Sequence, residues 1–239
     1  MALTYKAAGD TTIIIEFANE ISEKVNTQVR SMYLAIEKSL IAGIEEVVPT
    51  YRSLMICYNP LLVKASTLMQ QLKEIELHLE EIDIPKPKII EIPTLYGGDY
   101  GPDLDFVAEH NNLTSAEVIN LHSKGKYLIY MLGFTPGFPY LGGLDQKIAT
   151  PRLEKPRLSI PAGSVGIAGA QTGIYPIESP GGWRLIGRTP LRLFDPNREP
   201  HFLLQLGDYL QFKPVDESQY GLIKAQVDNN IFEVKTSLL

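Results

Sequence analysis

Arginine, aromatic, proline and glycine residues are concentrated between Met131 and Asp195. Arginine presents a planar fork of N–H donors that matches a carboxylate or a phosphate, and aromatic rings offer flat apolar walls. Glycine allows the backbone to approach a ligand closely, whereas proline stiffens the turns around it. This combination of residue types predicts a rigid, shaped surface that tolerates a small anion.

Two of the arginines, Arg152 and Arg157, occur in the pattern PR-x-x-x-PR, where each follows a proline that restricts the local backbone. Residues 145–192 carry seven basic and three acidic side chains, although the whole chain has a net charge of −6. This local excess of positive charge suits a bound carboxylate, carbamate or phosphate. The alternative is a set of solvated arginines on barrel strands.

A histidine, His122, is expected at the C-terminal end of a helix, just before the strand that leads into GFTPGFPY. A helix C-terminus favours positive charge, so an imidazolium there would bind an anion or donate a proton. The alternative is a solvated or structurally hydrogen-bonded histidine. The other histidines, His78, His110 and His201, have no neighbours at metal-ligand spacing, so no metal site is expected.

Aromatic residues near the arginines could line a groove, although most aromatic side chains of a small β domain belong to its core. They are Phe134, Phe138, Tyr140, Tyr175 and Trp183. The adjoining PGF and PGG turns are rigid, and loops of this kind are where ligands are usually bound. Neutral polar contacts to an amide or a lactam would come from Gln171, Thr172 and Ser179.

The elements that hold these residues fall into two parts of different composition. Residues 1–92 contain two glycines and four prolines, whereas residues 93–214 contain 16 glycines and 13 prolines. We therefore expect two domains, 1–92 and 93–239. Periodicity in the first part predicts the order β-α-β-β-α-β, with the last strand at 88–92, which is typical of a ferredoxin-like domain. Short strands and turns in the second part predict a β-barrel or sandwich, so the fold class is α+β.

Composition excludes several classes of protein. The 239 residues are 44% hydrophobic and 21% charged, as in ordinary globular proteins, and the negative net charge argues against a nucleic-acid-binding protein. Cys57 is the only cysteine, which excludes an internal disulfide and fits a reducing cytosol. Because no apolar run approaches the length of a membrane span, we expect a cytoplasmic protein that does not bind membranes.

Four blocks resemble the signature blocks of the family of 5-oxoprolinase B subunits: GFTPGFPYLGGL, PRLEKPR, IPAGSVGIAGAQTGIYP and SPGGWRLIGRTP. The family is also called allophanate hydrolase subunit 1 and includes the sporulation kinase inhibitor KipI. Related segments occur in the carboxyltransferase part of urea carboxylase. The resemblance runs nearly end to end, because GDTTIIIEF, VVPTYRSLMICY, YGGDYGPDL and GDYLQF also match.

The resemblance implies a small α/β domain followed by a cyclophilin-like β-barrel. It also implies that this chain acts with the C and A subunits of 5-oxoprolinase, and that the complex opens 5-oxoproline to glutamate and consumes ATP. No ATP site and no biotin-accepting motif is found in this sequence, so we expect a partner to bind ATP and this chain to bind no cofactor. The rival function is a regulatory protein that binds and inhibits a sensor histidine kinase.

The resemblance also implies residue roles by position. His122, Arg152 and Arg157 would stabilise an anion or an oxyanion. Gln171, Thr172 and Tyr175 would contact the substrate, while Phe138 and Trp183 would form apolar walls. Arg152, Arg157 and Trp183 are expected to share one hollow of the barrel.

Overall fold

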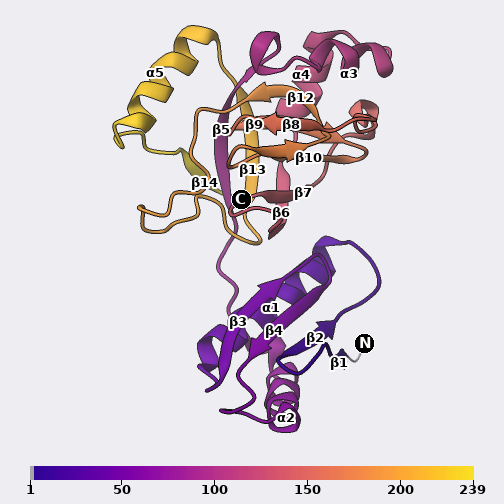
Figure 1. The fold of residues 1–239 in the computed structure, drawn as a ribbon, viewed down its shortest axis with the longest axis vertical. Helices are drawn as coiled ribbons and strands as arrows, with labels where there is room; N and C mark the ends of the chain where they lie inside the picture. Colours follow the sequence, from indigo (N-terminus) through magenta and orange to yellow (C-terminus); the bar gives the residue numbers. More distant parts are fainter. Residues whose placement is uncertain (1–2) are drawn as a thin grey trace. The chain divides into compact units, whose positions relative to one another are not determined.

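The computed structural model describes residues 3–239, which form two compact units (Figure 1). The division falls between Lys86 and Pro87, so it precedes the boundary expected at residue 92. The reason is strand β5 (Lys88–Tyr96), whose pairing partners all belong to the second unit. A strand belongs to the sheet that pairs its backbone N–H and C=O groups, and local sequence does not reveal which sheet that is.

The first unit packs two helices, α1 (Glu23–Ser39) and α2 (Ala65–Glu76), on a four-stranded antiparallel sheet. The strands are β1 (Thr4–Ala7), β2 (Thr12–Glu16), β3 (Ile44–Pro49) and β4 (Ser53–Tyr58), and their order in the sheet is β1-β2-β4-β3. Alternate residues of the two central strands are fully buried, namely Ile13, Ile15, Leu54 and Ile56. This alternation is expected of a sheet with one covered face.

The predicted ferredoxin-like β-α-β-β-α-β order is not confirmed, because its last strand is wrong. Residues 88–92 lie in β5 and do not join the first sheet. The edge beside β2 is occupied by β1, which the sequence did not predict. Its sequence, TYKA, is mostly exposed and therefore has no apolar alternation by which to recognise a strand.

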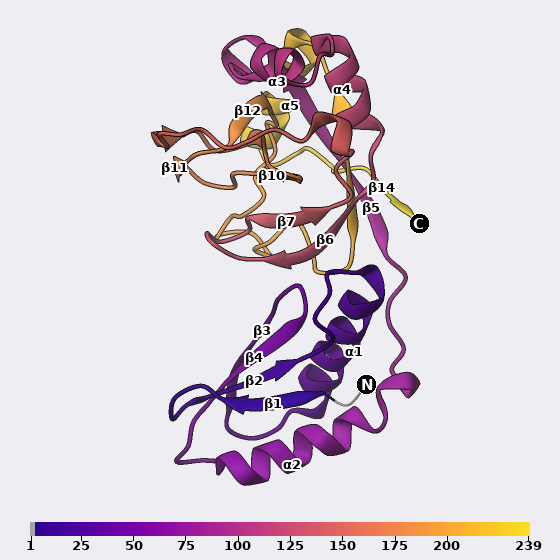
Figure 2. The ribbon, with the colours of Figure 1, turned by 90° about the vertical axis from the view of Figure 1, so that its right-hand side faces the viewer.

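The second unit is built on a strongly curved eight-stranded sheet. The path β10-β9-β12-β5-β13-β6-β7 is joined by β14, which pairs with β5. Besides β5, the strands are β6 (Tyr127–Leu132), β7 (Pro139–Gly142), β9 (Ser164–Ala168), β10 (Gln171–Ile174), β12 (Arg184–Arg188), β13 (Tyr209–Pro214) and β14 (Thr236–Leu238). A separate two-stranded sheet pairs β8 (Arg157–Ile160) with β11 (Ser179–Gly181), which is labelled in Figure 2.

The two ends of the long sheet approach each other, so the sheet forms a nearly closed barrel. β10 packs beside β7, although no backbone ladder joins them. A methyl group placed on Gly173 of β10 would lie 3.3 Å from the carbonyl oxygen of Pro139 in β7. Curvature of this degree covers the inner face on all sides, and it predicts buried residues from every strand in one core.

The barrel core is apolar and is covered by helices. Ile92, Ile129, Val165 and Phe212 come from four different strands, and each is fully buried. The helices of this unit are α3 (Leu104–His110), α4 (Ser115–Lys124) and α5 (Glu217–Asp228). Among residues 3–239, no helix has the length and the apolar character that a membrane crossing requires.

The start of α4 is held by a capping box formed by Thr114 and Glu117. The Thr114 hydroxyl accepts a hydrogen bond from the Glu117 backbone N–H at 3.2 Å. In return, the Glu117 carboxylate accepts one from the Thr114 backbone N–H at 2.8 Å. This exchange satisfies two N–H groups that have no partner within the helix.

We expect Thr114→Ala to lower the free energy of unfolding by about 1 kcal/mol, because it removes the cap from the first turn of α4. Ser115→Ala is the matched control, since the neighbouring Ser115 hydroxyl bonds only an exposed carboxylate at the surface. Urea unfolding followed by circular dichroism measures both variants. Equal stability of the two variants would show that the capping box contributes nothing.

Candidate functional site

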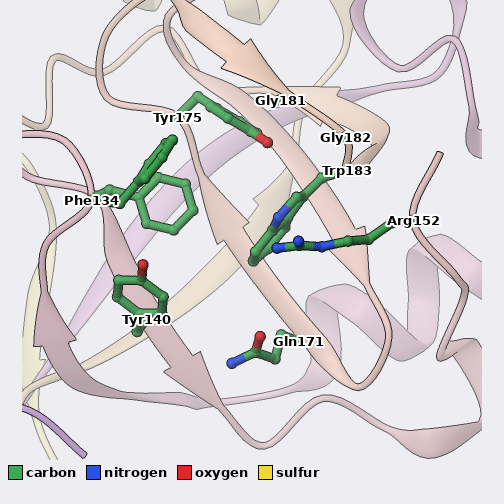
Figure 3. Close-up of a pocket in the computed structure, with 9 residues that line it drawn as sticks. Phe134, Tyr140, Arg152, Gln171, Tyr175, Gly181, Gly182 and Trp183 are labelled. Carbon is green, nitrogen blue, oxygen red and sulfur yellow. The ribbon is translucent and has the colours of Figure 1, made fainter. Parts of the chain in front are cut away.

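A pocket of about 190 Å³ opens on the barrel where β7, β10 and β11 come together (Figure 3). Its walls are mainly aromatic, with one guanidinium and one side-chain amide among them. It is lined by Phe134, Phe138, Tyr140, Arg152, Gln171, Tyr175, Gly181, Gly182 and Trp183. These residues come from segments far apart in the sequence, so the pocket exists only in the folded barrel.

Phe138 is the centre of the aromatic wall. Its ring lies 5.4–5.6 Å from those of four neighbours, Phe134, Tyr140, Tyr175 and Trp183, and each pair meets edge to face. This geometry places the positive edge of one ring against the negative face of the next, which stabilises the cluster beyond simple burial. Phe138 is only 2% exposed, whereas Phe134 is 66% exposed at the rim.

The hairpin loop GFTPGF between β6 and β7 places two of these rings. The Gly133 backbone N–H donates to the Phe138 carbonyl at 3.0 Å, and the Phe138 N–H donates to the Thr135 carbonyl at 3.0 Å. Phe134 itself has a left-handed backbone with φ of 64°, a conformation that is rare for a bulky residue. The closed loop therefore holds Phe134 in a conformation that it would seldom adopt alone.

Two glycines let the opposite wall pack tightly. A methyl group on Gly173 would lie 3.0 Å from Cζ3 of Trp183, and one on Gly181 would collide with the Tyr175 hydroxyl. The backbone N–H of Trp183 donates a hydrogen bond to that hydroxyl. Burial raises the pKa of Tyr175, and the nearby cations Arg152 and Arg157 oppose this rise. Tyr175 is thus a neutral phenol at physiological pH.

Arg152 supplies the positive charge of the pocket. Its side chain is exposed at the rim, and no carboxylate among residues 3–239 lies within ion-pairing distance of it. The backbone on both sides is nevertheless held. Leu153 donates from its N–H to the Gly182 carbonyl at 2.7 Å, and the Arg184 guanidinium donates to the Pro151 carbonyl at 3.4 Å. Its charge is therefore available to an anion, on a fixed backbone.

Arg157, the second arginine of the PR-x-x-x-PR pattern, does not line the pocket. Its Nη2 donates to the Asp103 carboxylate at 2.9 Å, and its Nη1 donates to the Trp183 carbonyl at 3.3 Å. The other oxygen of Asp103 accepts from the Leu185 N–H at 2.6 Å, and the Asp103 N–H donates to the Leu185 carbonyl at 2.8 Å. The pair thus holds the backbone on both sides of residue 184, which positions Trp183.

His122 and Thr172 lie in the barrel core, away from the pocket, and both are 0% exposed. The Thr172 hydroxyl donates to the Gly166 carbonyl at 3.0 Å, so it can only accept from His122 Nε2 at 2.8 Å. His122 Nδ1 therefore accepts from the Tyr96 hydroxyl at 2.7 Å. This directional chain fixes a neutral imidazole with its proton on Nε2.

The expected imidazolium at position 122 is wrong, because the side chain points inward from the last turn of α4. Burial lowers the pKa of His122 from 6.5 to about 3, so the ring is neutral at pH 7. Favourable interaction with the helix terminus is too small to offset the cost of removing a charge from water. The residue instead satisfies buried polar groups of β5 and β10.

Seven of the eleven predicted site residues line one pocket, and four do not. The seven are Phe134, Phe138, Tyr140, Arg152, Gln171, Tyr175 and Trp183. His122 and Thr172 belong to the core network, Arg157 supports the wall, and Ser179 is a mostly buried residue of β11 whose hydroxyl lies 3.5 Å from the Ile177 carbonyl. Their proposed chemical roles have no geometric support here.

Asp103, which positions the wall as much as Arg157 does, was not predicted from the sequence. An aspartate directly before a helix is ordinarily assigned to capping. Asp103 does stand at that position, but its side chain makes no cap and turns to Arg157 and Leu185 instead. Residues 3–239 contain no group of three or more His, Cys, Asp or Glu side chains that could hold a metal ion.

Comparisons with known proteins agree with this fold. Residues 3–204 match the family described as carboxyltransferase domain, subdomain C and D. A 5-oxoprolinase B subunit from Bacillus subtilis is 44% identical over 229 residues, which cover 91% of this chain and 95% of the relative. One of the same name from Escherichia coli O157:H7 is 41% identical over 212 residues, 87% of this chain and 94% of that relative. The resemblance seen in the sequence blocks is confirmed.

Two further similarities involve longer chains. A solved structure of protein TTHA0988 is 35% identical, with a TM-score of 0.77, and the match covers 86% of this chain but 40% of that chain. Urea amidolyase of Lachancea kluyveri is 26% identical over 99% of this chain, which is 15% of that protein. In both, the region similar to this chain is one part of a larger polypeptide.

We expect the free energy of unfolding to fall by about 2 kcal/mol between about pH 7.5 and about pH 5 because of His122. The folded pKa of about 3 lies below the unfolded value of 6.5. The unfolded chain therefore binds a proton first, and stability that is fully present above pH 6.5 is lost as the pH falls toward 3. Urea unfolding over this pH range measures the effect.

His78→Gln is the control for this measurement, since the His78 side chain is 67% exposed. It should lose stability as the unmodified protein does, whereas His122→Gln should show a flatter dependence on pH. A stability that does not change between these two pH values would contradict the buried neutral imidazole.

We expect Arg157→Ala to loosen Trp183 and to lower the free energy of unfolding by about 2 kcal/mol, because hydrogen bonds of a charged group are lost. Trp183 is the only tryptophan, so its fluorescence reports the pocket alone. Quenching by acrylamide should increase. Arg192→Ala is the matched control, since it removes an exposed arginine–aspartate pair elsewhere in the same unit. Unchanged quenching in Arg157→Ala would refute the positioning role.

Proposed function

This chain belongs to the family of carboxyltransferase domains, subdomains C and D, and we propose that it is the B subunit of an ATP-dependent 5-oxoprolinase. In that complex, 5-oxo-L-proline is hydrolysed to L-glutamate together with the A and C subunits. The observation that carries the proposal is the 44% identity to a 5-oxoprolinase B subunit, over nearly the full length of both chains. We also propose that the nearly closed barrel is cyclophilin-like.

The pocket at Arg152 suits the chemistry of this substrate. 5-Oxoproline is a small five-membered lactam that carries one carboxylate. The Arg152 guanidinium would bind the carboxylate, and the Gln171 side-chain amide would pair with the lactam amide. The apolar edge of the lactam ring would pack on Phe138 and Trp183. These contacts orient the lactam, and they leave its reacting carbonyl accessible from the rim.

The pocket lining contains no carboxylate, imidazole, amine or thiol that could activate water. None of its nine lining residues is an aspartate, glutamate, histidine, lysine or cysteine, and burial raises the pKa of Tyr175, so that phenol stays protonated at neutral pH. We therefore assign binding and orientation to this chain. The general base, together with the ATP that drives opening of a stable lactam, belongs to the partner subunits.

The names and lengths of the relatives support the proposal that this chain functions in a complex with other subunits. Two relatives are named as subunits, and in urea amidolyase the similar region is 15% of a longer protein. We propose the C and A subunits as the partners. None of the relatives named above is called a kinase inhibitor, so their names give no support to the alternative function as an inhibitor of a sensor histidine kinase. The cytoplasmic location stays a prediction.

We expect co-expression with the A and C subunits to give glutamate formation that depends on both ATP and 5-oxoproline. In that complex, Arg152→Ala should raise KM for 5-oxoproline about tenfold to about a hundredfold, because a charge-assisted hydrogen bond of about 1.5–3 kcal/mol is lost. The change in kcat should be smaller, since the carboxylate does not react. Arg192→Ala should leave both constants unchanged.

An intact complex that forms no glutamate would contradict the proposed function. An unchanged KM in Arg152→Ala would contradict the assignment of the carboxylate site, while the activity itself would stand. Complex formation is checked by size-exclusion chromatography for every variant, so that a failure of assembly is not read as a failure of binding.

A further inference from the structure

We propose that the pocket of this chain selects small cyclic monoanions whose nitrogen is uncharged and rejects zwitterionic amino acids, including the ring-opened product. The inference rests on the proposed function for the identity of the substrate. It concerns this chain alone, and it assigns to the pocket the discrimination between substrate and product.

Charged side chains are rare in the pocket lining. Among its nine lining residues, Arg152 is the only one with a charged side chain. At the Tyr175 hydroxyl, two cations act, Arg152 and Arg157, and no carboxylate contributes. The pocket is therefore positive, with no internal anion that could pair with an ammonium group.

Nearby carboxylates do not change this balance. Both oxygens of Asp103 already accept hydrogen bonds, one from Arg157 and one from the Leu185 N–H. Glu154 and Glu178, which lie close in the sequence, are exposed and are not part of the pocket lining. Arg157 is neutralised by its partner, whereas Arg152 has none among residues 3–239.

An α-amino acid would meet an unfavourable charge in this pocket. Its ammonium is attached to the same carbon as its carboxylate, so a carboxylate bound to Arg152 places the ammonium close to the guanidinium. Loss of hydration without an opposite charge is costly for such a group. In 5-oxoproline the corresponding nitrogen is a neutral amide N–H, which requires only a hydrogen-bond acceptor.

Attraction of an ammonium to aromatic faces is the opposing effect. The rings of Phe138, Tyr175 and Trp183 are 2%, 1% and 6% exposed, and they pack edge to face on one another. Their faces are thus largely covered by neighbouring rings, and Phe134, which is 66% exposed, lies at the rim. Repulsion by Arg152 acts across the open rim, so we expect it to dominate.

Glutamate is disfavoured for a second reason. Opening the lactam creates a second carboxylate in addition to the ammonium, and the pocket lining has one cation. The new carboxylate would lie against the apolar wall that held the ring, without a partner. Release of the product is thereby favoured by the same surface that binds the substrate.

The experiment uses the purified full chain without partners and follows Trp183 fluorescence, since Trp183 is the only tryptophan. The ligands are 5-oxo-L-proline, L-proline, L-glutamate and cyclopentanecarboxylate, titrated near pH 7.5. We expect 5-oxoproline to bind at least tenfold more tightly than proline or glutamate. Cyclopentanecarboxylate, which keeps the ring and the carboxylate but lacks the amide, should bind between them.

Arg152→Gln should weaken binding of 5-oxoproline at least tenfold and reduce its advantage over proline. Arg192→Ala should bind as the unmodified chain does, and thermal melting verifies that both variants fold. Proline or glutamate binding as tightly as 5-oxoproline would overturn the proposal, and so would an isolated chain that binds none of the ligands.

The two proposals fail separately. A complex that converts 5-oxoproline, combined with an isolated chain that does not discriminate, overturns the selectivity and leaves the function standing. The expected order of affinities in the isolated chain, combined with an inactive complex, supports the selectivity and overturns the function.

Discussion

The pocket wall depends on the ion pair between Asp103 and Arg157, which also bonds the neighbouring backbone. Asp103 stands before α3, Arg157 lies on β8, and Trp183 precedes β12, so three distant segments meet at this pair. Two oxygens and two guanidinium nitrogens bind each other and the backbone of residues 183–185. A partly buried pair of this kind contributes less through its net energy than through the single backbone arrangement that it permits.

Aromatic packing is the second interaction that fixes the pocket wall. Phe138 contacts four rings at once. Gly173 leaves room for the Phe138 and Trp183 rings, and Gly181 leaves room for the Tyr175 hydroxyl. Near closure of the barrel brings β7 and β10 together, so rings from a hairpin loop and rings from the far end of the sheet share one wall. Glycine at positions 173 and 181 is therefore a packing requirement of the pocket.

The three residues predicted to carry a positive charge differ in charge state and in pairing. Arg157 is neutralised by Asp103, His122 is buried and neutral, and Arg152 at the rim has no carboxylate partner among residues 3–239. One available charge beside a mostly apolar wall fits a ligand with one carboxylate and a compact body. Since the pocket lining has no carboxylate, imidazole, amine or thiol to act as a base, binding in this chain and chemistry in its partners are complementary parts of one proposed reaction.

Sequence alone determined the features that depend on local interactions. The capping box at Thr114, the strand and helix periodicities, and the aromatic–arginine composition of the pocket follow from neighbouring residues, and seven of the nine lining residues were predicted. Only the tertiary structure decided that β5 joins the barrel, that His122 faces the core, and that Asp103 binds Arg157. Each of these features depends on contacts between segments far apart in the sequence. A buried N–H, carbonyl or charge must find a partner, and the local sequence does not show which distant segment supplies it.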